Sequence, residues 1–162
     1  ATIAAAKHNG PVYIRSGRPN VEDLPESKFE IGKANILKKG NDITIIACGL
    51  MVQESLHAAE ELEKKGISAQ VINMHTIKPI DKDAIIKAAK ETKRIITAEE
   101  HQINGGLGSA VAEVVAQSCP VPMKFIGIKD TFGESGTPYE LLKKYGLTKE
   151  EIVKEAEKLI KH

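Results

Sequence analysis

The sequence predicts a three-layer α/β/α domain that contains a mostly parallel sheet of about five strands, with one antiparallel strand at its edge. Two observations lead to this fold class. Short apolar runs alternate with segments whose apolar residues recur at helical spacing. Two of the apolar runs are separated only by the turn-forming residues 38–42, which is a hairpin signal. At 162 residues and 41% hydrophobic composition, the chain can bury the core of one such domain.

An N-terminal piece of different character precedes the domain. Residues 2–8 read as the last turns of a helix, which Gly10 is suited to end in the left-handed conformation. Residues 11–15 predict a strand. Residues 16–30 contain glycine, two prolines and several charges, which is the composition of a linker. The compact domain is therefore expected to begin near Phe29.

Strands and helices alternate through the domain. The first two strands are expected to pair with each other as an antiparallel hairpin. The strand at 94–98 is nearly all apolar, which is typical of a strand buried on both faces. Asp81 is placed as the N-cap of the helix that follows it. The predicted strands are 34–37, 43–48, 69–74, 94–98 and 121–128, and the predicted helices between them are 51–65, 81–91 and 106–117.

Two further helices are predicted in the C-terminal tail. Thr137 and Glu140 form a capping-box pattern, with Pro138 at the first helical position. Thr148 and Glu151 form a second capping-box pattern, and a stripe of apolar residues follows it. Each of these helices is expected to present one apolar face.

The composition argues against several classes of function. Basic and acidic residues nearly balance, 23 against 22, and the net charge of +1 gives no electrostatic basis for binding nucleic acid or an anionic membrane. No apolar run approaches the roughly 20 residues that cross a bilayer. Cys48 and Cys119 lie far apart without metal-ligand spacing, so free thiols in a reducing cytoplasm are expected.

The segment 98–109 is the most conspicuous candidate for a site. It joins a predicted buried strand to a helix, and open α/β sheets bind ligands beyond the carboxyl ends of their strands. Its glycines would let backbone N–H groups approach an anion, but their spacing matches neither the dinucleotide motif nor a P-loop. Glu99 and Glu100 would also repel a phosphate. Tight packing of the helix on the sheet is the preferred interpretation, and an effector site at Gly105–Ser109 is the alternative.

Other titratable residues form no recognisable catalytic or metal-binding set. His75 lies at a predicted strand end, where a loop or interface role is preferred. The adjacent residues 99–101 point in different directions and do not form a chelating face. Neither Cys48 nor Ser109 has a base at a recognisable spacing. No catalytic, cofactor-binding or metal-binding residue is therefore predicted in this chain.

Arg15 and Arg18 follow the strand predicted in the N-terminal piece. An arginine beside serine and glycine at the carboxyl end of a strand is suited to hold a phosphate through two parallel hydrogen bonds. Taken alone, a surface salt bridge explains these arginines at least as well.

Five segments, taken in order, make nearly the whole chain similar to the C-terminal part of transketolase. The resemblance is to the archaeal, split bacterial and animal branches in particular. Each segment alone is a weak signal, but the ordered set is specific. The segments are 10–19 (GPVYIRSGRP), 29–34 (FEIGKA), 75–81 (HTIKPID), 99–108 (EEHQINGGLG) and 132–136 (FGESG).

The resemblance implies a division of the chain and a place in a larger enzyme. Residues 1–19 resemble the end of the domain that binds the aminopyrimidine of thiamine diphosphate, residues 20–28 a linker, and residues 29–162 the complete C-terminal domain. Transketolases hold the diphosphate and metal in a further domain. Their active sites form at a homodimer interface, and the C-terminal domain mainly supports that dimer.

The resemblance also implies an activity. Transketolases of the pentose phosphate pathway move a two-carbon ketol unit from a ketose phosphate to an aldose phosphate, using thiamine diphosphate and magnesium. Arg15 matches the family arginine that holds the sugar phosphate, and Arg18 lies within reach of the same site as a second candidate. The activating glutamate and the Gly-Asp-Gly motif of the family are not in this sequence. The chain alone is therefore expected to bind neither cofactor nor metal and to be inactive.

Two related enzymes and one different class of protein remain as alternatives. The C-terminal domains of 1-deoxyxylulose-5-phosphate synthase and of the 2-oxo-acid dehydrogenase beta subunit share the Lys-Pro-x-Asp and Glu-Glu to Gly-x-Gly patterns. The run from Ile14 to Pro19 and the Glu-Glu-His triplet favour transketolase. The alternative of another class is a non-catalytic module that dimerises or binds an effector.

Overall fold

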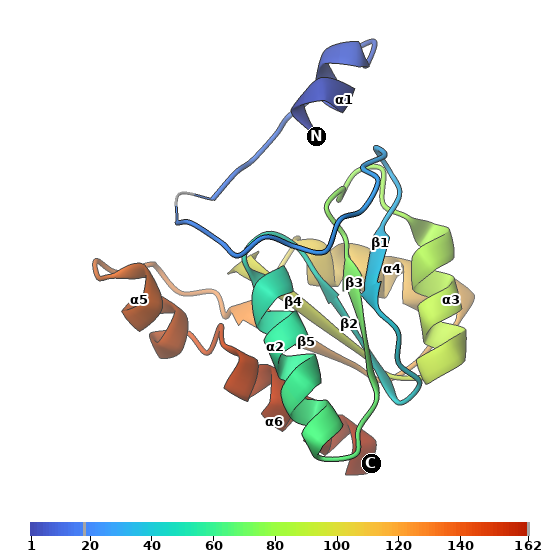
Figure 1. The fold of residues 1–162 in the computed structure, drawn as a ribbon, viewed down its shortest axis with the longest axis vertical. Coiled ribbons are helices and arrows are strands. Elements are labelled where there is room, and N and C mark those ends of the chain that lie inside the picture. The colour runs from blue at the N-terminus through green and yellow to red at the C-terminus, as the bar shows by residue number, and fades with distance from the viewer. Residues whose placement is uncertain (18, 162) are drawn as a thin grey trace.

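The computed structural model describes residues 1–17 and 19–161. Figure 1 shows a sheet with helices on both faces and an N-terminal arm that extends beyond them. The strands are β1 (Asn35–Lys38), β2 (Ile43–Ala47), β3 (Ala69–Asn73), β4 (Ile95–Gln102) and β5 (Met123–Ile128). The helices are α1 (Thr2–Lys7), α2 (Met51–Lys64), α3 (Lys82–Thr92), α4 (Leu107–Ser118), α5 (Pro138–Lys144) and α6 (Lys149–Lys161).

The sheet has the strand order β1-β3-β2-β4-β5. The strands β3, β2, β4 and β5 run parallel, and β1 pairs antiparallel with β3 at the edge. The predicted fold class is therefore confirmed. The predicted hairpin is wrong, because β1 pairs with β3 and not with β2. Both edges of β2 are occupied by the parallel neighbours β3 and β4, so the edge open to β1 is that of β3.

The two faces of the sheet bury separate apolar clusters. Helices α2 and α6 pack together over one face, where Leu62 and Ile152 are fully buried. Helices α3 and α4 cover the other face, where Ile85 and Val111 are fully buried. Apolar residues of the central strands alternate between the two clusters, as the period of a strand requires. Helix α5 stands outside these layers and contributes no buried residue (Figure 1).

The capping residues predicted for α3 and α5 are confirmed. Asp81 is the N-cap of α3 and accepts a hydrogen bond from the Ala84 amide at 3.1 Å. Its second carboxylate oxygen accepts from the Ala34 amide at 2.9 Å, so one side chain fixes both the start of α3 and the chain entering β1. Thr137 and Glu140 form the predicted capping box of α5.

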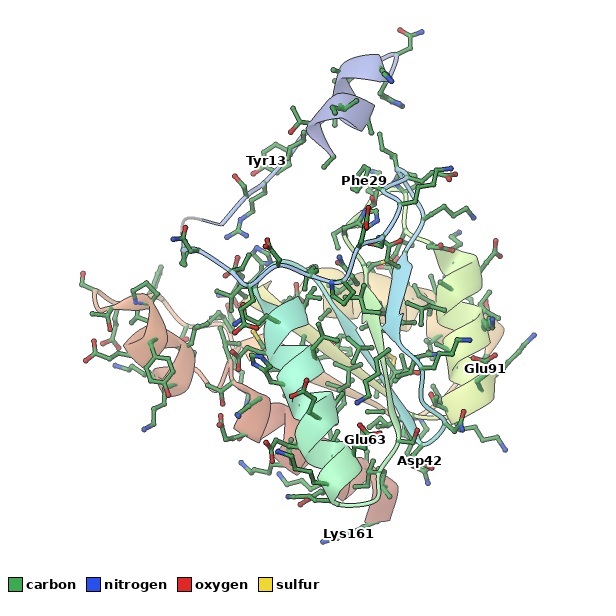
Figure 2. All side chains as sticks on the ribbon, in the orientation of Figure 1. Tyr13, Phe29, Asp42, Glu63, Glu91 and Lys161 are labelled. Atoms are coloured by element: carbon green, nitrogen blue, oxygen red, sulfur yellow. The ribbon has the colours of Figure 1, made fainter. Side chains whose placement is uncertain are left out.

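The described part of the N-terminal arm, residues 1–17 and 19–28, begins with α1 away from the sheet and reaches the domain through contacts such as those of Arg15 and Glu22 (Figure 1). The predicted strand at 11–15 is absent, because a strand needs a neighbour to pair with and the described residues offer none there. Tyr13 points away from the domain and is 87% exposed (Figure 2). The Glu22 amide donates to Gln53 of α2 at 3.0 Å, which is one of the contacts between arm and domain.

Among the described residues, no helix has both the length and the apolar character needed to cross a bilayer.

Replacing Gly40 with alanine should destabilise the domain by about 2 kcal/mol or more, because a buried backbone contact leaves no room for a methyl group. A Cβ at this position would lie 2.2 Å from the Ala69 carbonyl carbon and 2.3 Å from the Gln70 amide nitrogen. Urea denaturation measures the loss. Gly133→Ala is the matched control, because nothing lies within 4 Å of a Cβ there. Equal stability of the two variants would contradict the packing described for the loop between β1 and β2.

Candidate functional site

The topological switch point of the sheet lies between β2 and β4. From β2 the chain adds β3 on one side and later β4 on the other, so the connections diverge at this point. In open α/β sheets the crevice beyond these two strand ends is the usual place for a ligand. Cys48 and Gly49 follow β2 here, and Glu99 and Glu100 lie in the last part of β4. These four residues make up the switch-point cluster.

A carboxylate of the chain itself occupies the start of α4. Glu99 is only 1% exposed. Its two oxygens accept hydrogen bonds from the Leu107 and Gly108 amides, each at 2.8 Å. These amides belong to the first turn of α4, where unpaired N–H groups and the helix dipole favour a negative charge. Glu99 therefore takes the position that the anion of a ligand would take in a phosphate-binding turn.

The glycines of the turn are needed for this close approach. A Cβ on Gly106 would lie 2.1 Å from the Glu99 Oε2 atom, and one on Gly108 would lie 2.9 Å from the Thr97 Oγ1 atom. Ser109 closes the turn, since its hydroxyl accepts from the Gly105 amide at 2.8 Å. The contacts support the interpretation that these glycines serve helix–sheet packing.

Sequence reasoning missed the capping role of Glu99. The signal was present, because α4 begins at a glycine N-cap, Gly106, which has no side chain to satisfy the first amides. Glu99, an acidic residue near the end of a buried strand, could supply the missing side-chain acceptor. The separation of eight residues between Glu99 and Leu107 lies outside the local capping patterns that a sequence reveals.

Glu100 forms an ion pair with the arm. The Arg15 Nη1 atom donates to the Glu100 Oε1 atom at 2.9 Å, across 85 residues of sequence. The Arg15 side chain is 47% exposed and that of Glu100 is 16% exposed. The salt bridge considered for Arg15 in the sequence is thus present, and its role toward a sugar phosphate stays a prediction. Arg18, the second candidate, lies outside the described residues.

The surroundings of Cys48 disfavour the thiolate form that a nucleophilic cysteine needs. Its thiol is buried, and burial raises its pKa to about 12, with smaller contributions from the nearby charges of Glu99 and Glu100. Arg15 opposes part of this rise in the pKa. Both cysteines are free thiols, and Cys119 is only partly buried.

The two histidines near the strand ends do not complete a catalytic set. His75 stacks on Phe29 with ring centroids 4.3 Å apart, and burial lowers its pKa below 6.5. The His101 Nδ1 atom lies 4.0 Å from the Glu99 Oε2 atom, which is too long for a hydrogen bond. The described residues contain no group of three potential metal ligands.

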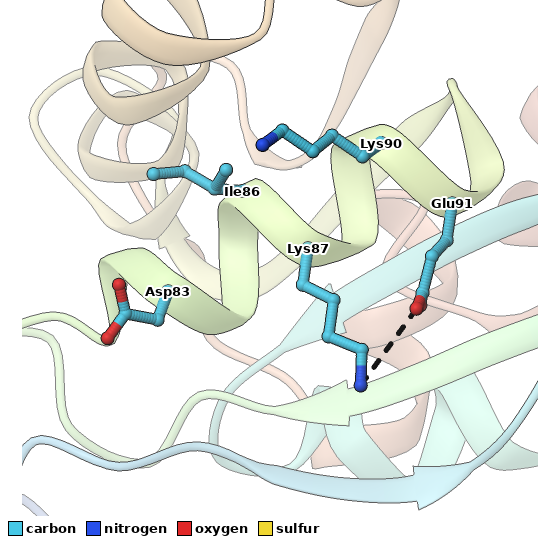
Figure 3. Close-up of a pocket in the computed structure, with 5 residues that line it drawn as sticks. All are labelled: Asp83, Ile86, Lys87, Lys90 and Glu91. Carbon is cyan, nitrogen blue, oxygen red and sulfur yellow. Dashed lines mark ion pairs between the residues drawn. The ribbon is translucent and has the colours of Figure 1, made fainter.

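A shallow hollow on the outer face of α3 has no convergent polar groups (Figure 3). The ion pair between Lys87 and Glu91, at 3.9 Å, follows the helix surface at one turn's spacing. The hollow is lined by Asp83, Ile86, Lys87, Lys90 and Glu91.

The fold and the turn define an α/β domain in which Glu99 of the chain itself occupies the start of α4 at the switch point. The family described as "Transketolase, C-terminal domain" matches residues 32–152. The chain therefore belongs to the transketolase C-terminal domain family.

Relatives and a solved structure agree with this assignment. The 6-deoxy-6-sulfo-D-fructose transketolase subunit SqwH of Clostridium sp. (strain MSTE9) is 49% identical over 92% of this chain and 47% of its own length. One subunit of the apulose-4-phosphate transketolase of Phocaeicola vulgatus is 47% identical over 93% of this chain and 49% of its own. A structure described as a split gene transketolase, inactive beta4 tetramer, is 46% identical, has a TM-score of 0.93, and is matched over 97% of this chain and 52% of its own. The chain thus spans about half the length of these proteins.

Glu99→Gln should destabilise the domain by about 1–3 kcal/mol. The glutamine side chain has one oxygen to accept a hydrogen bond, and its NH2 group would face the second backbone N–H group of α4. Chemical denaturation measures the difference. Glu113→Gln is the control, since Glu113 is exposed on the same helix. A cost no larger than that of the control would show that Glu99 does not cap α4.

Protonation of His75 should make the domain less stable in acid. Because burial lowers the folded-state pKa, the unfolded chain takes up the proton first as the pH falls. The His75 contribution is complete above about pH 6.5 and is lost progressively below it. Denaturation midpoints of the wild type and His75→Gln at pH 7.5 and 5.5 test this, with exposed His8→Gln as control. A pH dependence that His75→Gln leaves unchanged would refute the assignment.

Proposed function

We propose that this chain is the C-terminal section of a thiamine-diphosphate-dependent transketolase, and that its task is to support assembly of that enzyme. The observation that carries the proposal is family membership combined with close similarity to chains named as transketolase subunits. The intact enzyme would transfer a two-carbon ketol unit between sugar phosphates. Glu99 supports the assembly role, because it occupies the helix end that would otherwise attract a diphosphate.

The switch-point cluster does not suit the diphosphate of thiamine diphosphate or its magnesium ion. The first amides of α4 already donate hydrogen bonds to Glu99. The other side chains of the switch-point cluster are the Glu100 carboxylate, which repels a diphosphate, and the Cys48 thiol, whose pKa is raised. Metal ligands do not gather among the described residues. Cofactor and metal are therefore assigned to the diphosphate-binding and pyrimidine-binding domains of the same or a partner chain, with residues 1–19 as the end of the latter.

Exposed apolar side chains support a role in assembly. Tyr13 of the arm is 87% exposed, and Phe132 and Tyr139 near α5 are 97% and 74% exposed. Large apolar residues at such exposure suit contacts with other domains or subunits. We assign these contacts to a cytoplasmic enzyme in which two copies of this section meet, as a homodimer or within a larger oligomer.

Arg15 is the residue proposed to hold the anionic end of the sugar. Its side chain is about half exposed, and its guanidinium makes one hydrogen bond to Glu100 of the switch-point cluster. The substrates in the names of the two relatives, 6-deoxy-6-sulfo-D-fructose and apulose-4-phosphate, both carry a tetrahedral oxyanion. An arginine fork matches such a group in shape and charge.

A calorimetric titration separates this chain from the complete enzyme. Thiamine diphosphate with magnesium should release no binding heat with the chain alone. Mixing the chain with the domains that bind thiamine diphosphate should restore exchange between ketose and aldose phosphates. One-site cofactor binding by the chain alone would contradict the proposal.

The same mixture discriminates the other candidates. Decarboxylation of pyruvate in place of ketose-phosphate exchange would favour a 1-deoxyxylulose-5-phosphate synthase or a 2-oxo-acid dehydrogenase. An oligomer with no turnover under any of these conditions would favour a non-catalytic module.

A further inference from the structure

The position of Glu100 is defined by three separate parts of the chain. Its carboxylate lies at the end of β4 and accepts from Arg15 of the arm at 2.9 Å. A Cβ on Gly49, just after β2, would lie 3.6 Å from the Glu100 Oε1 atom, and one on Gly17 would lie 3.8 Å from it. Glu100 therefore sits at the switch point, between the end of β2 and the passing arm.

Burial makes Glu100 the fixed member of its ion pair. Its side chain is 16% exposed and belongs to a strand, while the Arg15 side chain is 47% exposed and belongs to an arm without regular structure at that point. An ion pair at this exposure adds little to the stability of the fold. The ion pair has a larger effect on the conformation of Arg15, because a long arginine side chain has many rotamers and the hydrogen bond to Glu100 selects among them.

We propose that Glu100 is a positioning residue that holds the Arg15 guanidinium in place for the terminal oxyanion of the sugar substrate. This inference rests on the proposed function. The hydrogen bond to Glu100 uses only the Nη1 side of the guanidinium, and the described residues provide no second partner for its other N–H groups. The remaining N–H groups of Arg15 are free to bind the substrate oxyanion. Glu100 of the switch-point cluster then supports an arginine that belongs to the N-terminal arm.

The electrostatic surroundings agree with this division of roles. The switch-point cluster contains the two carboxylates of Glu99 and Glu100, and the charge of Glu99 is already balanced by the amides of α4. The remaining negative charge attracts a cation and repels a free anion. Arg15 binds there first, and the oxyanion binds to Arg15 on its exposed side.

Glu100→Gln in the complete enzyme should raise KM for a phosphorylated ketose about fivefold to tenfold and change kcat less than about twofold, because Arg15 must then be ordered by the substrate itself. KM for hydroxypyruvate, which has no phosphate, should not change. Glu63→Gln is the matched control, since it breaks an exposed pair with Lys38 at 2.7 Å.

Two kinetic outcomes would overturn the positioning role while leaving the proposed function intact. One is an unchanged or lowered KM for the phosphorylated ketose. The other is an equal increase of KM for both substrates. Absence of ketose-phosphate exchange in the wild-type enzyme would instead refute the proposed function, and this inference with it. The NMR signals of the Arg15 guanidinium in this chain give a readout without activity, because the hydrogen bond to Glu100 is made by that group. Arg15 signals in Glu100→Gln that match those of the wild type would also contradict the proposal.

Discussion

The buried carboxylate of Glu99 is the interaction on which the arrangement of the site depends. It fixes the distance between the end of β4 and the start of α4 through two hydrogen bonds to backbone amides. Charge-assisted bonds to a helix N-terminus are among the stronger polar contacts in a protein, and here they are fully buried. The glycines of the turn then follow as a requirement, since a Cβ at Gly106 would overlap the carboxylate.

This constraint links the fold to the proposed function. A fold that usually offers an anion site at its switch point has filled that site from within. What remains at the switch point is a second carboxylate, Glu100, which faces the arm and pairs with Arg15. We infer that the domain acts on its neighbours through this side-chain contact and through apolar surfaces such as Phe132, and that the cofactor is held elsewhere in the enzyme.

Within the compact domain, the sequence predicted the features that depend on neighbouring residues, whereas the strand predicted at 11–15 of the arm is absent. Helices, caps such as Asp81, and the alternation of strands with helices follow from periodicity and short-range patterns, and the structure agrees with them. The pairing of β1 with β3 was missed, because it depends on which strand edges remain free after the sheet has formed. A salt bridge of Arg15 was considered, but its partner Glu100 and the Glu99 cap were missed, because each contact joins residues that only the tertiary fold brings together.

An NMR titration with inorganic diphosphate tests the self-capped turn most directly. The amide signals of Leu107 and Gly108 report on the start of α4, where Glu99 is bound. We expect these signals to stay in place at millimolar diphosphate, because the anion position is occupied. Saturable shifts of both amides would contradict this expectation, and would show that the turn is a ligand site.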